Sequence, residues 1–349
     1  MTRWFVQRVA YAATRLGFSA GCLAIRIFPR QWIFGFSDAL ANLAFILFRS
    51  FRARSIKNIN IALGDNFGGI NGREIARRSL RNFFRACVEA AVTLESSADD
   101  LRSTIPVSGR EYLDAALTKG NGVILLSAHL GNFFLIGTRL AIEGYSIHVL
   151  VNQPRDGQFA KLMDNYRSQV RQRTIHAKPR RDALKQLYLV LRRNELAMVI
   201  ADEYRKGNGM RAQLFGRAVL ARRGPATLAL RTGAAMVPVY MVRQPNDSLR
   251  LIIEPELELI RSGKGTGKIR ENTLQMTQWL ERIVRAYPDQ WNWMNIRWWE
   301  TDENRLLTAP HHQSKVSLSD EDTARQSPKT LVVPSECEGS KRDFSVRSK

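Results

Sequence analysis

The sequence predicts an α/β protein in which a mixed central sheet is flanked by helices, with a separate helical segment at the N-terminus. Short apolar runs recur from residue 122 onward, at 122–127, 145–151, 196–201, 235–242 and 249–255. Stretches with helical patterning follow or separate them, near 132–143, 156–173, 180–193, 224–233 and 270–286. Strands that alternate with helices are typical of a sheet whose faces those helices cover.

The charge of the chain points to a polyanionic partner. Lys and Arg number 53 against 32 Asp and Glu, which gives a net charge of +21 over 349 residues. Nucleic acid, anionic lipid headgroups and a phosphorylated substrate would each fit such a charge. The sequence has no zinc-finger, helix-turn-helix or RNP-like pattern, so we expect no nucleic-acid partner.

Metal and cofactor motifs are missing from the sequence. Cys22, Cys87 and Cys337 are too far apart for a C-x-x-C metal site or a disulfide framework. There is no P-loop, no dinucleotide-binding glycine fingerprint and no cluster of His and Cys. We therefore expect chemistry without a metal or a cofactor.

The N-terminal segment is predicted to attach to a membrane. Residues 31–48 form a largely apolar window in which Asp38 is the only charged residue, and a basic collar with Arg49, Arg52, Arg54 and Lys57 follows. The window is short for crossing a bilayer, so attachment is either single-pass or monotopic, and a buried helix hairpin is the alternative. Residues 72–95 add an amphipathic helix rich in arginine.

These patterns divide the chain into three parts. Residues 1–60 would form the anchoring helices and the collar, and residues 61–307 the α/β domain. Residues 308–349 are poor in apolar side chains and are predicted to be a disordered tail.

The segment 122–137, GVILLSAHLGNFFLIG, carries the strongest chemical signal. A buried strand leads through a small-residue turn to His129, which would lie at the carboxyl edge of the sheet, where α/β proteins place their sites. Asn132 is predicted to cap the next helix, which would set His129 beside a helix N-terminus. A histidine by itself is also compatible with a purely structural role.

This segment resembles the H-x-x-x-x-(D/E) block of the glycerolipid and lipid A acyltransferases. Three further segments agree with that family in order and spacing: 212–243, with F-G, G-P and T-G-A-x-x-V-P-V; Asp202 at the end of a strand; and YPDQWNWMNIRWW at 287–299. The resemblance spans roughly residues 50 to 300.

The resemblance implies an activity and a location. In this family a histidine removes the proton from an acceptor hydroxyl, which attacks an acyl thioester on acyl carrier protein, with coenzyme A as the lesser alternative donor. The acceptor would be a lipid A precursor or another phosphorylated glycolipid or lysolipid. The enzyme would act on the cytoplasmic face of an inner membrane, against its anionic surface.

One position departs from the family pattern. The residue five after His129 is Phe134, which cannot orient an imidazole as a carboxylate does. Loss of the orienting carboxylate costs about 10⁴ in rate in serine proteases. Three alternatives remain: Asp202 or Glu203 supplies the carboxylate, the enzyme runs slowly on His129 alone, or the chain is an inactive lipid-binding homologue.

Several residues are candidates for substrate binding. Arg222 and Arg223 precede Gly224-Pro225, where two guanidiniums at a helix N-terminus would hold phosphate, unless they are an ordinary solvated pair. The tryptophans around Arg297 fit either a headgroup-level surface or a packed core. The complete candidate set is Asn132, Arg155, Arg167, Phe215, Gly216, Arg222, Arg223, Gly224 and Arg297.

Overall fold

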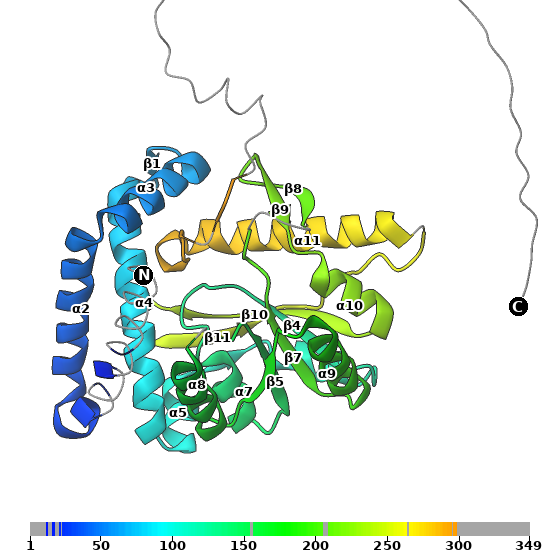
Figure 1. The fold of residues 1–349 in the computed structure, drawn as a ribbon, viewed down its shortest axis with the longest axis horizontal. Coiled ribbons are helices and arrows are strands. Elements are labelled where there is room, and N and C mark those ends of the chain that lie inside the picture. The colour runs from blue at the N-terminus through cyan, green and yellow to red at the C-terminus, as the bar shows by residue number, and fades with distance from the viewer. Residues whose placement is uncertain are drawn as a thin grey trace, which may run out of the picture.

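A seven-stranded mixed sheet forms the centre of the computed structural model, which describes residues 12, 16–17, 21, 23–153, 156–204, 209–263, 265–294 and 296–298 (Figure 1). Its strands, in spatial order, are β3 (Val107–Ser108), β11 (Leu249–Ile253), β10 (Ala235–Arg243), β4 (Val123–Ser127), β7 (Leu196–Ile200), β5 (Ile147–Val151) and β6 (Arg173–His176). Only the β10–β11 pair is antiparallel. The mixed sheet is therefore confirmed.

Helices cover both faces of this sheet. They are α5 (Ala98–Thr104), α6 (Arg110–Leu117), α7 (Ile136–Ile142), α8 (Gly157–Gln169), α9 (Arg180–Arg192), α10 (Gly224–Thr232) and α11 (Gly265–Ala286). Alternate residues of β4 enter opposite cores: Ile124 and Leu126 pack with α9, α10 and α11, while Val123 and Leu125 pack with α6, α7 and α8. A strand buried on both faces needs the continuous apolar run that this segment has.

Two small hairpins lie outside the main sheet. β1 (Asn66–Phe67) pairs with β2 (Ile70–Asn71), and β8 (Met210–Leu214) pairs with β9 (Arg217–Ala221). Two short 3₁₀ helices are also present, η1 (Thr93–Glu95) and η2 (Pro288–Gln290).

The predicted helix at 132–143 begins too early. The helix starts at Ile136, and the prediction that Asn132 caps it is wrong. The reason is that residues 131 and 132 pair with neighbouring backbone instead: the N–H of Gly131 bonds to the carbonyl of Gln290, and that of Asn132 to the carbonyl of Met241. The dipole of a helix starting at 132 is therefore not available to His129.

The predicted helix at 156–173 runs too long at its C-terminus. It ends at Gln169, Arg171 takes a positive φ of 62°, and residues from Arg173 form β6. The edge of the sheet beside β5 needs a hydrogen-bonding partner, and this requirement overrides a weak helical pattern.

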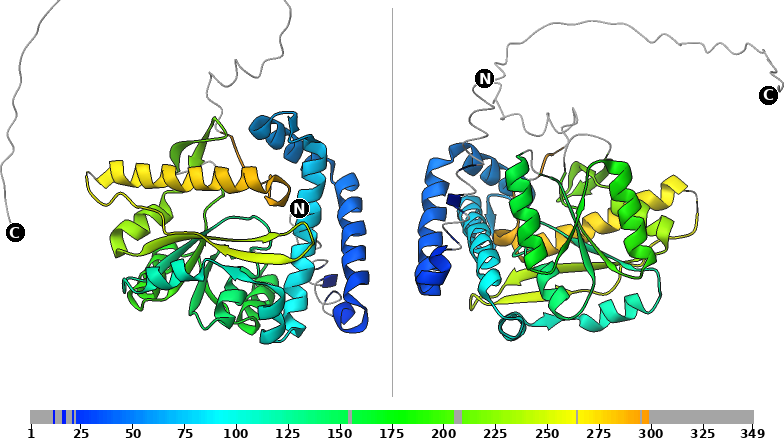
Figure 2. Two further views of the ribbon diagram at one scale, coloured as in Figure 1. Left: turned by 180° about the vertical axis from the view of Figure 1, so that it is seen from behind. Right: turned by 60° about the horizontal axis from the view of Figure 1, so that its bottom comes forward.

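The N-terminal helices stack on one side of the sheet. α2 (Arg30–Leu47) lies alongside α4 (Gly72–Val92) (Figures 1 and 2). α3 (Arg49–Leu63) follows α2 in the sequence after a sharp bend. In the part of the chain that is described, no single helix has the length and apolar character to cross a bilayer, although α2 and α3, bent by 89°, meet both criteria as a pair.

The N-terminal helices are tied to the sheet through a buried arginine. Arg85 of α4, 9% exposed, holds both carboxylate oxygens of Asp38 on α2 at 2.7 Å. The same guanidinium bonds to Asp247, in the β10–β11 turn. One side chain therefore joins three elements that are distant in sequence.

Three predicted segments lie wholly or partly outside the described residues. These are the first part of the anchoring segment 1–60, Arg155, and the tail 308–349.

Replacing Arg85 with methionine should destabilise the fold, because it leaves the partly buried Asp38 carboxylate with only the longer, 3.5 Å contact to the partly exposed Arg81. We expect a loss of about 2 kcal/mol in the free energy of unfolding, measured by urea denaturation. The matched control is Arg78→Met, which removes an exposed bond to Glu74 on the same helix and should cost about 0.5 kcal/mol. Equal losses would contradict the role given to Arg85.

Candidate active site

His129 and Asp202 meet at the carboxyl edge of the sheet. They follow β4 and β7, which are parallel neighbours, so both side chains leave the sheet at the same edge. The His129 Nδ1 lies 2.7 Å from Asp202 Oδ1, and the His129 backbone N–H donates to Oδ2 at 2.8 Å. The imidazole is 21% exposed and the carboxylate 1%. A buried acid thus holds a partly accessible ring.

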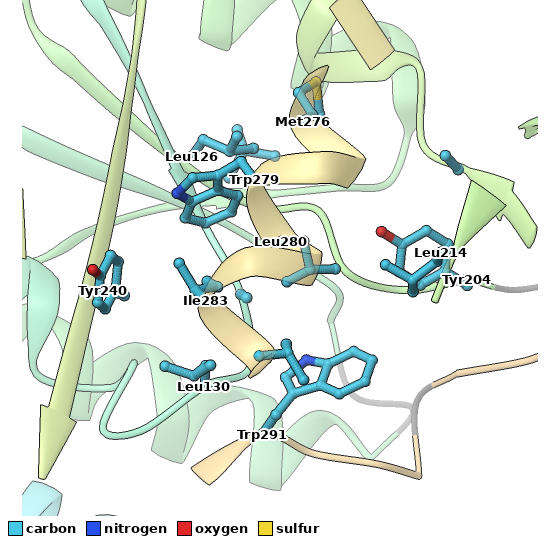
Figure 3. Close-up of a cluster of buried hydrophobic side chains, with 14 of the residues drawn as sticks. Leu126, Leu130, Tyr204, Leu214, Tyr240, Met276, Trp279, Leu280, Ile283 and Trp291 are labelled. Atoms are coloured by element: carbon cyan, nitrogen blue, oxygen red, sulfur yellow. The ribbon is translucent and has the colours of Figure 1, made fainter. Parts of the chain in front are cut away.

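Trp291 provides a third contact to the same carboxylate. Its indole Nε1–H donates to Asp202 Oδ2 at 2.8 Å. Trp291 follows η2 and lies beyond the end of α11, in the same buried cluster as Leu130 and Leu280 (Figure 3). The side chain is fully buried, so this bond is shielded from water.

These contacts determine the charge of Asp202 and the tautomer of His129. Burial alone would raise the pKa of Asp202, but the charge and the ring N–H of His129, the Trp291 indole and the His129 backbone N–H together hold that pKa below its ordinary value. An ionised carboxylate only accepts hydrogen bonds, so Nδ1 of His129 carries the hydrogen. In a neutral ring Nε2 is then the basic nitrogen.

The loop after His129 is held between two backbone segments. Gly131 and Asn132 bond to Gln290 and Met241, and the N–H of Asn292 donates to the carbonyl of His129 at 3.0 Å. Gly131 has a φ of 57°, and a Cβ there would collide with the carbonyl oxygen of Met241. Glycine is therefore required at this position for the loop to approach β10 so closely.

A buried polar network supports the same loop from α4. Asn132, 1% exposed, donates to Glu89 at 2.8 Å. The same Glu89 oxygen accepts from Arg243 at 2.9 Å, and Arg243 also donates to Asn82. The structure thus places Asn132, a predicted substrate-binding residue, inside a network that fixes the loop.

Phe134 occupies the position at which the family motif has a carboxylate. The Phe134 ring packs against Phe133, with ring centres 4.1 Å apart, and against Phe83 at 6.3 Å. Phe133 in turn lies edge-on to the His129 ring at 5.0 Å. The carboxylate beside His129 comes instead from a position 73 residues later in the chain.

The structure brings Arg222 to the same sheet edge. Its Nε donates to the backbone carbonyl of Glu203 at 3.1 Å, and its Nη2 lies 3.5 Å from the Glu203 carboxylate. Arg222 and Asp202 also line one small cavity of about 10 Å³, the size of a single water. Arg223 and Gly224 follow, exposed, at the start of α10.

Phe215 and Gly216 form the turn of the β8–β9 hairpin. Both have a positive φ, 52° and 70°, as in a type I′ turn. Phe215 is 7% exposed, its N–H donates to Glu281 at 2.6 Å, and its ring packs 6.0 Å from that of Trp293. These two predicted binding residues thus lie where they support the packing around Trp291 and Trp293.

The last three candidates for substrate binding are Arg167, Arg297 and Arg155. Arg167, on α8, bonds locally to Asp164 and Thr174. Arg297 is exposed within the tryptophan motif, directly before Trp298. Arg155 lies outside the described residues.

The described tryptophans of the motif fit the packed-core role. Trp291 and Trp293 are buried, and Trp298 packs against the same core and donates its indole N–H to Asn58 at 3.0 Å. Trp299 lies outside the described residues.

Two features of this site have no direct signal in local sequence patterns. The bond from Trp291 to Asp202 joins residues 89 positions apart, although both belong to quoted motifs. Glu89 stands among the arginines of an amphipathic helix, and nothing in its local pattern indicates a partner near His129.

Among the described residues, no group of three or more His, Cys, Asp or Glu is arranged to hold a metal ion.

Comparison with known proteins gives a consistent set of relatives. The family model for bacterial lipid A biosynthesis acyltransferases matches residues 4–300. A phosphatidylinositol mannoside acyltransferase of Mycolicibacterium smegmatis is 23% identical over 291 residues, which cover 82% of this chain and 91% of that protein. The lipid A biosynthesis palmitoleoyltransferase of Escherichia coli is 24% identical over 244 residues, 69% of this chain and 76% of that protein.

The matched region contains the sheet, His129, Asp202 and the tryptophan motif up to Trp299. The chain therefore belongs to the bacterial lipid A biosynthesis acyltransferase family, a family of acyl-transferring enzymes.

Proposed function

We propose that this protein transfers a fatty acyl group from an acyl carrier protein thioester to a hydroxyl of a phosphorylated glycolipid or lysolipid, such as a lipid A precursor. The observation that carries the proposal is the His129 imidazole held at Nδ1 by a buried carboxylate. Both named relatives above are acyltransferases of glycolipid pathways by their names. No cofactor is needed for this reaction, because the thioester itself is activated.

The chemical step follows from the tautomer of His129. Nε2 takes the proton of the acceptor hydroxyl as its oxygen attacks the thioester carbonyl carbon. The tetrahedral intermediate collapses with cleavage of the carbon–sulfur bond, and the thiol leaves with the proton from the imidazolium. Asp202 stays ionised and stabilises the imidazolium between these two transfers, as in the serine protease arrangement.

The phosphates of the acceptor require cations near the imidazole. Arg222 and Arg223 stand at the N-terminus of α10, on the sheet edge that carries His129 and Asp202. Guanidiniums at a helix N-terminus bind phosphate through paired hydrogen bonds and the helix dipole. We assign the headgroup of the acceptor to this pair.

The lipid acceptor would be met at the cytoplasmic face of an inner membrane. α2 exposes a row of large apolar side chains: Trp32 and Phe36 at 70%, Leu43 at 50%, Ile46 at 62%, Leu47 at 63%, with Phe48 at 62% directly after it. So large an exposed apolar face is typical of an interaction surface. The collar of Arg49, Arg54 and Lys57 in α3 follows, which suits anionic headgroups.

Removal of the base should abolish turnover. We expect His129→Ala to lose at least about 10⁴ in kcat when purified protein is given acyl carrier protein thioester and a disaccharide lipid acceptor, with products measured by mass spectrometry. Equal background with wild type and variant would leave only the inactive lipid-binding alternative.

Two variants test whether Asp202 supplies the carboxylate that acts with His129, in place of a residue at motif position 134. Asp202→Asn should lower kcat by about 10³ to 10⁴, because an amide cannot stabilise the imidazolium, while Phe134→Ala should keep the rate within a few-fold. Wild-type rates in Asp202→Asn would refute the assignment of Asp202. A severe loss in Phe134→Ala alone would show that the aromatic position is the critical one.

Trp291 is expected to position the carboxylate without touching the substrate. Trp291→Phe keeps an aromatic ring but removes the N–H, so kcat should fall roughly tenfold with little change in KM. The carboxylate that has lost a donor stabilises the imidazolium more strongly, so the acid limb of the pH–rate profile should move to higher pH. An unchanged profile would contradict this coupling.

A further inference from the structure

The outer face of α9 exposes large apolar side chains. Its inner face is buried through Ala183, Leu187, Val190 and Leu191. On the opposite side, Leu184 is 44% exposed, Tyr188 45% and Leu189 43%. Neighbouring apolar side chains on a solvent face cost solubility, and such a group is typical of a binding surface.

Cations surround these side chains. Arg181, Lys185 and Arg192 are exposed and fall on the same outer face, since they are four and seven residues apart. None of them forms an ion pair with another described residue. On α4, by contrast, Arg77 and Arg78 both form ion pairs with Glu74. α9 therefore keeps its positive charge for a partner.

α9 begins at the edge of the sheet that carries His129. β6 runs parallel to β4, ends at His176, and leads within four residues into Arg180, the first residue of α9. Three strand spacings separate β6 from β4, which is roughly 15 Å. A partner on α9 would thus be close to the imidazole without covering it.

α9 is also distant from the helix that we assign to the membrane. α2 lies at one side of the molecule and α9 toward the other, in Figure 1 and in the right view of Figure 2. A molecule that rests on a membrane through α2 leaves α9 accessible to a soluble partner. This placement favours an acidic protein over a lipid surface as the occupant.

We propose that the outer face of α9 is the docking surface for the acidic carrier protein that delivers the acyl thioester. This inference rests on the proposed function and adds the place where the donor binds. Arg181, Lys185 and Arg192 would pair with carboxylates at the rim of the contact, and Leu184, Tyr188 and Leu189 would form its apolar centre. The charges mainly raise the rate of association.

The test compares two triple variants with the same change in net charge. One is Arg181→Glu/Lys185→Glu/Arg192→Glu on α9; the control is Lys161→Glu/Arg250→Glu/Arg270→Glu, at exposed positions on other elements. The α9 variant should weaken the Kd for acyl carrier protein, and raise its KM as donor, roughly ten- to a hundredfold. The control should change both less than about threefold.

Two further measurements distinguish failure of the docking proposal from failure of the proposed function. A small acyl-pantetheine donor needs no docking, so the α9 variant should use it at the wild-type rate; a loss there, or equal effects in both triple variants, would overturn the proposal. Binding to vesicles with anionic lipid should be unchanged, and its loss with full carrier affinity would assign α9 to the membrane instead. If wild type turns over neither donor, the proposed function fails, while the Kd for carrier protein still decides whether α9 binds it.

Discussion

The arrangement at the active site depends on one buried carboxylate. Asp202 is 1% exposed and accepts hydrogen bonds from the His129 ring, the His129 backbone and the Trp291 indole. A buried charge is tolerated only when such donors replace its water. Because these donors come from β4 and from the segment after α11, the requirement to satisfy this carboxylate also joins distant parts of the chain at the sheet edge.

The carboxylate and the loop after His129 form one rigid unit. The loop is bonded to Met241 in β10 and to the backbone around Trp291, and Gly131 permits this close approach. Glu89 and Arg243 extend the unit to α4, which Arg85 connects to α2. The helices nearest the proposed membrane surface are thus linked to the imidazole through continuous polar contacts.

Much of the fold follows from local patterns in the sequence. β4 and β7 are apolar runs whose ends carry His129 and Asp202, so length and apolar character predict both strands, while their parallel pairing comes from the topology of the sheet. The start of α7 and the end of α8 differ from the sequence pattern, because tertiary backbone pairing and the formation of β6 override helical patterning there. The contacts of Trp291 and Glu89 depend on the full topology, which no single segment encodes.

The central claim concerns the tautomer that Asp202 imposes on His129, and ¹⁵N NMR of the imidazole tests it most directly. The account predicts that near neutral pH the neutral ring carries its hydrogen on Nδ1, in a strong hydrogen bond that disappears in Asp202→Ala. A ring with its hydrogen on Nε2, or an Nδ1–H signal that is unchanged without Asp202, would contradict it.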